Sequence, residues 1–273
     1  MRHKVWALLL ILTMNCYAQG KRPVEPDHAG PTMAEPLWSP FATVSPGVPM
    51  NSGSYAQPGV AGKVSVNELR IPPKAIHELQ QSLKAYKSGD WRDSATHLEK
   101  ALSIDPQYYP AHNALGMLYV RLHEYQKALG EFEQTTAKEP RSAQALHNLS
   151  ATLVLLKRYA EGEIAARAAL QIDPMRATTR YVLGIALVDQ GHPTSEALEL
   201  LKQSSTEVPN ARLVLAQALI GRGAKEEAKA ELRVYLATPN APGKDDVEKW
   251  VKELDNEAGS KNATEDETID PAR

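Results

Sequence analysis

The chain contains 273 residues, of which 42% are apolar and 6% aromatic, and this length suits one or two globular domains. Its 31 Lys and Arg residues nearly balance 33 Asp and Glu residues, so the formal net charge of −2 gives no electrostatic reason to expect binding to nucleic acid. No apolar run approaches the roughly 18 residues needed to cross a bilayer, and the sequence therefore predicts no integral membrane span.

The first 18 residues have the pattern of a secretory signal peptide. Arg2 and Lys4 precede an apolar stretch at 5–14, and Cys16 and Ala18 place small residues three and one before the cut. We therefore expect cleavage after Ala18 and export, to a periplasm or out of the cell. A buried N-terminal helix is the alternative interpretation.

Cys16 raises a second alternative, a bacterial lipoprotein with a lipid anchor at this residue in the outer membrane. The resemblance to a lipobox is poor, because Asn15 stands where a small residue is required and Thr13 where Leu is usual. If cleavage follows Ala18 instead, the mature chain has no cysteine. Packing, rather than a disulfide, would then stabilise it.

Residues 19–62 contain eight Pro and six Gly residues and no sustained apolar period, so we predict a disordered linker. Trp38, Phe41 and Tyr55 could be docking anchors within it, although scattered aromatic residues need no such role. Residues 63–74 alternate apolar and polar residues and end in a double proline, which predicts an extended lead-in to the first helix.

The remainder of the chain repeats itself with a period of 34 residues. Each of four features recurs at a fixed position in three successive periods: a Leu followed by a small residue, an aromatic residue, a second small residue, and an acidic residue followed by proline. The corresponding residues are Leu115-Gly116, Leu149-Ser150 and Leu183-Gly184; Trp91, Tyr125 and Tyr159; Ser94, Ala128 and Gly162; and Asp105-Pro106, Glu139-Pro140 and Asp173-Pro174. Because several independent columns agree, the period indicates a tandem repeat.

One unit, residues 109–142, shows why these residue types recur. Apolar residues at helical spacing predict two helices, at 111–122 and 125–138, with a short turn between them. Gly116 and Ala128 have almost no side chain, so the two backbones can approach closely while larger side chains fill the surrounding space.

The order Leu-Gly, Tyr, Ala, Phe and Pro within this unit resembles the tetratricopeptide repeat. The resemblance implies an all-α fold, a right-handed superhelical solenoid of about five helix-turn-helix repeats with a C-terminal capping helix. The predicted segments are repeats at about 75–108, 109–142, 143–176, 177–208 and 209–237, a cap at 243–256, and an acidic disordered tail at 257–273; the repeat domain thus covers 75–256.

Two repeats depart from the pattern of the family. The first has Gln81-Ser82 where Leu-Gly is expected, and the fourth has Pro193 in place of the aromatic residue together with one extra residue. We expect an atypical first repeat and an altered turn in the fourth.

In this family the first helix of each pair lines a concave groove, and the resemblance carries that role to matching positions here. The implied partner-binding residues are Asn113, Met117, Val120, Arg121, His147, Asn148, Ala151, Val154, Leu155, Tyr181, Ile185 and Val188. Asn113 and Asn148 could hold the backbone of an extended peptide, since an amide both donates and accepts hydrogen bonds. The alternative is that the apolar members pack against adjoining repeats. With Arg121 as the only cation of the set, no clamp for a terminal carboxylate is expected.

Motifs of catalysis are missing from the sequence. It has no G-x-S-x-G, H-E-x-x-H or phosphate-loop motif, and its histidines lie singly without cysteine partners. We expect no enzyme activity, no metal site and no cofactor. The sequence thus predicts an exported, non-catalytic scaffold of a bacterial periplasm or envelope, which binds a protein or peptide partner of unknown identity in its groove. A lipid-anchored assembly or structural component of the envelope is the alternative.

Overall fold

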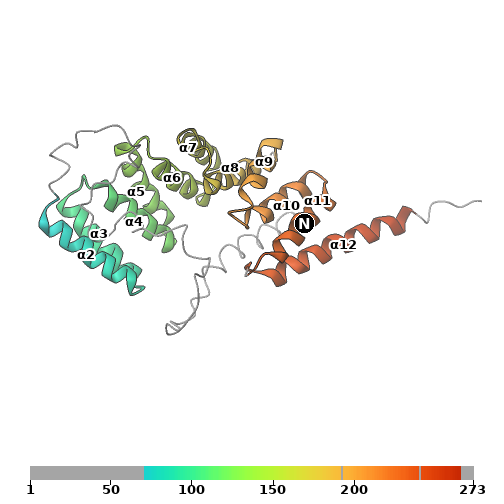
Figure 1. Cartoon of the computed structure of the whole chain (residues 1–273), viewed down its shortest axis with the longest axis horizontal. Helices are drawn as coiled ribbons and strands as arrows, with labels where there is room; N and C mark the ends of the chain where they lie inside the picture. The colour runs from blue at the N-terminus through green and yellow to red at the C-terminus, as the bar shows by residue number, and fades with distance from the viewer. Residues whose placement is uncertain (1–70, 192, 240, 266–273) are drawn as a thin grey trace, which may run out of the picture. The chain divides into compact units, whose positions relative to one another are not determined.

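The computed structural model describes residues 71–191, 193–239 and 241–265, and all regular structure within these residues is α-helical (Figure 1). The predicted signal peptide with Cys16, the linker, the lead-in as far as residue 70 and the last eight residues of the tail lie outside them. The helices are α2 (Pro73–Lys87), α3 (Trp91–Ile104), α4 (Tyr109–Arg121), α5 (Tyr125–Lys138), α6 (Ala143–Leu155), α7 (Tyr159–Ile172), α8 (Ala177–Asp189), α9 (Ser195–Ser204), α10 (Ala211–Gly221), α11 (Lys225–Ala237) and α12 (Lys244–Glu265). This confirms the predicted all-α helical repeat fold.

The described chain divides into two compact units, 71–182 and 183–265, with the boundary inside α8. In the first unit, α2 packs on α3, α4 on α5 and α6 on α7, and each hairpin also contacts the next one. Its core holds the fully buried side chains of Leu98, Leu118 and Phe132. Each helix pair is therefore one repeat, and the partly buried Leu149 packs against both clusters of buried residues in this unit.

Local sequence signals account for the helix ends. Asp90 and Ser142 cap α3 and α6, because their side chains accept hydrogen bonds from the backbone N–H groups of Asp93, at 3.0 Å, and Ala145, at 3.3 Å. Helix α5 has the predicted bounds, whereas α4 begins at Tyr109, two residues earlier than predicted. Pro110, in the first turn of α4, fixes a helical backbone angle there and explains the earlier start.

The turn inside each hairpin contains one residue with a left-handed backbone. These residues recur at the repeat period in the first unit, and they are Gly89, His123 and Lys157, followed by Gly191 and Gly223 in the second. Glycine adopts a positive φ without strain, but His123 and Lys157, both with φ of 61°, do so at a cost. Two of the repeats thus store strain at a fixed place.

Replacing Lys157 with Gly is expected to raise the free energy of unfolding by about 0.5–1 kcal/mol, since the relief of left-handed strain exceeds the added entropy of the unfolded chain. Urea denaturation would measure the change. As a control, Lys138→Gly makes the same substitution at the exposed last residue of α5, where it should destabilise by up to about 1 kcal/mol. Equal effects of the two variants would contradict the interpretation.

Small residues lie where the two helices of a hairpin cross. A Cβ atom on Gly116 would lie 2.7 Å from Cε1 of Phe132, and one on Gly184 would lie 2.7 Å from Cγ of Leu201. The predicted close approach is therefore present, and at Gly116 the space that glycine leaves is taken by the Phe132 ring. Ala128 of the facing helix is also fully buried.

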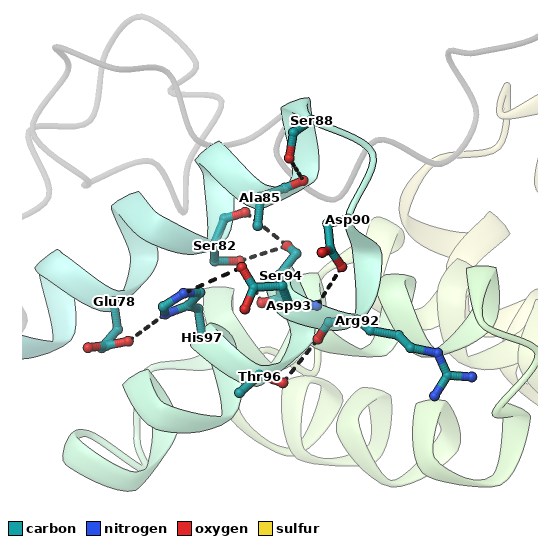
Figure 2. Close-up of polar contacts among 10 residues, drawn as sticks. All are labelled: Glu78, Ser82, Ala85, Ser88, Asp90, Arg92, Asp93, Ser94, Thr96 and His97. Atoms are coloured by element: carbon teal, nitrogen blue, oxygen red, sulfur yellow. Dashed lines mark hydrogen bonds and ion pairs between the residues drawn. The ribbon is translucent and has the colours of Figure 1, made fainter. Parts of the chain in front are cut away.

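In the first repeat, two serines lie where the two helices approach closely (Figure 2). Ser82 and Ser94 occupy the positions of Gly116 and Ala128, and both are fully buried. The Ser82 hydroxyl donates to the Ser94 carbonyl and the Ser94 hydroxyl lies within reach of the Ser82 carbonyl, each at 2.9 Å, and the two Oγ atoms are also 2.9 Å apart. These bonds satisfy polar groups that burial would otherwise penalise, which explains how an atypical first repeat keeps the fold.

The second unit continues the pattern with a shorter α9. This helix begins at Ser195, after Pro193, and Thr194 caps it by accepting from the N–H of Ala197 at 3.1 Å. The turn is thus altered as expected, because the aromatic residue is the first residue of α3, α5 and α7, whereas α9 begins two residues after Pro193. Helix α11 then packs on α10 and α12.

Helix α12 closes the second unit and is longer than predicted. Val247 and Leu254 are buried, and the Nζ atom of Lys229 on α11 bonds Asp255 at 3.0 Å. The backbone stays helical to Glu265, so the predicted boundary at 256 falls inside the helix and residues 257–265 differ from the expected disordered tail. Ala, Glu and Lys in that stretch are strong helix formers, which accounts for the difference.

Candidate partner-binding surface

A chain of polar side chains joins the first helices of two successive repeats to the start of a third. The Asn148 amide donates to Oδ1 of Asn113 on α4 and accepts from Nε2 of Gln144, both at 2.8 Å. Arg176, in the turn before α8, donates to Oε1 of Gln144 at 2.5 Å and to Asp173 at 3.1 Å. The chain of bonds fixes these side chains relative to one another.

Asn148 itself is only 1% exposed, and its amide already donates to one neighbour and accepts from another. Asn113 is partly exposed and so lies nearer to solvent. In this arrangement Asn148 orders the neighbouring repeats, while Asn113 is the member of the predicted pair that solvent reaches.

His147 lies next to Asn148 and points into the packed interior. Its side chain is 5% exposed, and Nδ1 lies 3.0 Å from the Thr179 hydroxyl of α8. Burial lowers the pKa of His147 to about 4, and the nearby positive charge of Arg176 acts in the same direction. The ring is therefore neutral at pH 7.

Arg121, the predicted cation of the groove, lies over an aromatic ring of the preceding repeat. Its guanidinium carbon is 3.9 Å from the centre of the Trp91 ring, close enough for a cation–π contact. The charge therefore contributes to packing between the first and second repeats.

The other predicted groove residues differ in exposure. Met117, Val120, Ala151 and Val188 are buried, and Val154, Tyr181 and Ile185 are half-buried. Leu155, at the end of α6, is 44% exposed. The predicted groove residues from Asn113 to Tyr181 belong to the first unit, whereas Ile185 and Val188 belong to the second.

Sequence reasoning missed Gln144 and Arg176. Gln144 lies one helical turn before Asn148, and that spacing is the signal that could have found it. Arg176 lies in a turn, and no helical period points to it. A contact across 32 residues became visible only in the folded chain.

Pairs of one acidic and one basic side chain, at a fixed spacing, connect the two helices of three hairpins. They are Glu78 with His97, His112 with Glu131, and Arg212 with Glu231, each 19 residues apart, with nitrogen–oxygen distances of 2.7, 2.6 and 2.5 Å (Figure 2 shows the first). His112 also has Nε2 3.1 Å from the Pro106 carbonyl, so both ring nitrogens face acceptors. The hydrogen bond with Glu131 raises the pKa of His112.

Among the residues that the structure describes, no helix combines the length and apolar character of a membrane span. Nor do these residues contain a group of three or more His, Cys, Asp or Glu side chains arranged to bind a metal ion.

Comparisons with known proteins agree with the helix pairing. Tetratricopeptide repeat family models match residues 85–153 and 181–244. Protein FlbA of Caulobacter vibrioides is 27% identical over 162 residues, which are 57% of this chain and 26% of FlbA, so the match spans about a quarter of that relative.

Solved structures share the fold at low sequence identity. MamA from Desulfovibrio magneticus RS-1 has a TM-score of 0.57 and 16% identity, over 62% of this chain and 96% of that one. YrrB has a TM-score of 0.51 and 19% identity, over 61% of this chain and 87% of that one. With the 34-residue period and the repeated helix hairpins, the two family-model matches show that the chain contains tetratricopeptide repeats, and the solved structures share its fold.

Proposed function

We propose that this protein is an exported, non-catalytic scaffold that binds a peptide segment or protein partner on one surface of its first unit. This surface, the first-helix surface, comprises α4, α6 and the start of α8. The observation that carries the proposal is the polar chain from Asn113 through Asn148 and Gln144 to Arg176. It holds successive repeats in one arrangement, and a preorganised surface loses less entropy when a partner binds.

The character of this surface supports a peptide rather than a small molecule as the partner. Leu155 offers exposed apolar area, and Asn113 adds a partly exposed amide. An extended peptide needs apolar contact and a few amide groups along a line, and successive repeats supply both. YrrB, of the same fold, is described as a tetratricopeptide protein with an unusual peptide-binding site.

Export rests on the sequence alone, on the basic start, short apolar centre and small residues of the first 18 positions. We place the protein in a bacterial periplasm or envelope, and a lipid anchor at Cys16 would be the alternative means of keeping it there. The tetratricopeptide family consists largely of interaction modules, which fits a non-catalytic role.

The test is affinity capture from an envelope extract with the wild-type chain and a Leu155→Asp variant, with captured proteins identified by mass spectrometry. Leu155 is a better target than Val154, because a Cβ on Gly162 would lie 3.0 Å from Cγ2 of Val154, so Val154 packs against α7. A charge at the exposed Leu155 should leave the fold intact and remove the partner, by at least about 1–2 kcal/mol of binding free energy.

Ile104→Asp is the matched control. Ile104, on α3, is 38% exposed, similar to Leu155, and it lies on a second helix rather than a first. We expect this variant to capture the same proteins as wild type. Identical lists from wild type and Leu155→Asp would contradict binding on the first-helix surface.

A further inference from the structure

The second helix of the third repeat, α7, exposes an apolar stripe. Ile164 is 70% exposed and Ile172 45%, and Met175, just beyond the helix, is 72% exposed. Ala160 lies one helical turn before Ile164, and Ala168 lies between Ile164 and Ile172. The order along one side of the helix is therefore Ala, Ile, Ala, Ile in four-residue steps.

The equivalent positions of the two preceding repeats are almost entirely polar or lack a side chain. In the second repeat they are Gln126, Gly130, Gln134, Lys138 and Arg141, and in the first they are Arg92, Thr96, Lys100, Ile104 and Gln107. The fold therefore does not require apolar residues in this register, because the outer side of the second helix faces water in those repeats. The apolar residues of α7 need another explanation, and an exposed apolar patch usually marks an interaction surface.

The stripe is complementary to itself. If a second copy is related by a two-fold axis beside residue 166, α7 meets its counterpart antiparallel. Ile164 then lies opposite Ala168 of the second copy, and Ala160 opposite Ile172, so a large side chain meets a small one in every layer. A two-fold interface requires this reciprocity, in which residue i contacts j and j contacts i.

The charges beside the stripe fit the same arrangement. Glu163 and Arg167 form an ion pair within α7 at 2.9 Å, and the two-fold axis brings Arg167 of each copy beside Glu163 of the other. Gln171, four residues after Arg167, lies on this same flank, whereas Glu161 lies on the other. No like charges are forced together without a counter-charge.

From these observations we propose that the chain forms a homodimer through α7, with two copies packed antiparallel along Ala160, Ile164, Ala168 and Ile172. A single helix stripe buries less area than the roughly 800 Å² per partner of a standard interface, so the dimer is weak and concentration-dependent. It lies on second-helix side chains and leaves the first-helix surface proposed above free.

Sedimentation velocity of the full chain, measured from about 1 to 500 μM, tests the proposal, since weak interfaces of this size associate at micromolar concentrations or above. We expect the wild type to shift from monomer to dimer across this range. Ile164→Glu and Ala168→Lys should each weaken the association by at least about tenfold, because a charge enters an apolar contact.

Mixing the two variants distinguishes the proposed geometry from any other contact. In a mixed pair, Glu at 164 of one copy meets Lys at 168 of the other, and the second contact stays Ile against Ala. An equimolar mixture should therefore recover dimers that neither variant forms alone. Ile104→Glu places the same charge at the register of Ile172 in the first repeat, and this variant should associate like the wild type.

Three results would overturn the proposal. They are a wild-type chain that stays monomeric over the whole range, an Ile164→Glu variant that dimerises as well as wild type, and a mixture that remains monomeric. Circular dichroism melts of each variant confirm folding, and the high exposure of Ile164 predicts no loss of stability from its replacement.

Discussion

Replacing Gly116 with Val is expected to lower the free energy of unfolding by about 3 kcal/mol, the largest single-site effect on folding that we predict. The first added carbon would already lie 2.7 Å from Cε1 and 2.9 Å from Cζ of Phe132. Phe132 is fully buried, so its ring cannot move aside without opening the core between α4 and α5. Chemical denaturation of both proteins measures the difference.

Gly130, on α5 of the same repeat, provides the matched control. A Cβ there would meet nothing within 4 Å, so Gly130→Ala should stabilise the chain by about 0.5–1 kcal/mol through helix propensity alone. A second test adds Phe132→Leu to Gly116→Ala. If the ring causes the clash, the double variant loses less stability than the two single losses combined. If the loss in the double variant equals the sum of the two single losses, the clash has another origin.

Acidification is expected to destabilise the protein through His147 by about 3 kcal/mol between pH 6.5 and pH 4, on the scale of 1.36 kcal/mol per pH unit. The unfolded chain binds a proton at the ordinary histidine pKa near 6.5, whereas burial lowers the pKa of folded His147 to about 4. Between these values the unfolded state holds more protons. The stabilisation that comes from the neutral His147 is therefore complete above pH 6.5 and is lost as the pH falls towards 4.

The control is His147→Gln, which keeps a side chain that can hydrogen-bond to the Thr179 hydroxyl but cannot titrate in this range. Free energies of unfolding measured at several pH values should fall less steeply with acid for the variant than for wild type. Carboxylate protonation affects both proteins, so the difference between the two curves isolates His147. Parallel curves would contradict a buried neutral ring.

His112 should act in the opposite direction. Because Glu131 raises its pKa, the stabilisation from this pair is complete below pH 6.5 and is lost as the pH rises through the folded value. The opposite signs of the two histidines explain why single variants, and not the wild-type curve alone, are needed to separate them.

The sequence predicted most of the helices because their ends depend on nearby residues. The capping Asp90 acts at the start of its own helix, and the 34-residue period then transfers each assignment to the next repeat. The prediction for α4 overlooked Pro110 and therefore began two residues too late. The serine pair in the first repeat was not predicted. In the sequence, Gln81-Ser82 appeared only as a departure from Leu-Gly. Ser94 pairs with Ser82 because the two helices that carry them meet, although the two serines are 12 residues apart in the sequence.

The candidate surface was harder to predict for a related reason. The family pattern assigns positions to the first helices, but whether a side chain faces a partner or another repeat depends on its neighbours in space. Asn148 became part of a polar chain only because Gln144 and Asn113 lie on either side of it. Arg121 likewise contacts Trp91 only because two repeats pack against each other.

The left-handed residues at Gly89, His123 and Lys157 have a consequence for how such a chain could lengthen. These residues are spaced by one full period. A tandem duplication of any 34 residues within 75–176 therefore keeps the hairpin turns and the close helix crossings at their regular spacing where the two copies join. Gly191 and Gly223 are only 32 residues apart, so the same duplication there would shift the turn out of phase with the apolar positions. We therefore expect a 34-residue duplication to preserve the fold in the N-terminal repeats and to destabilise it in the C-terminal ones.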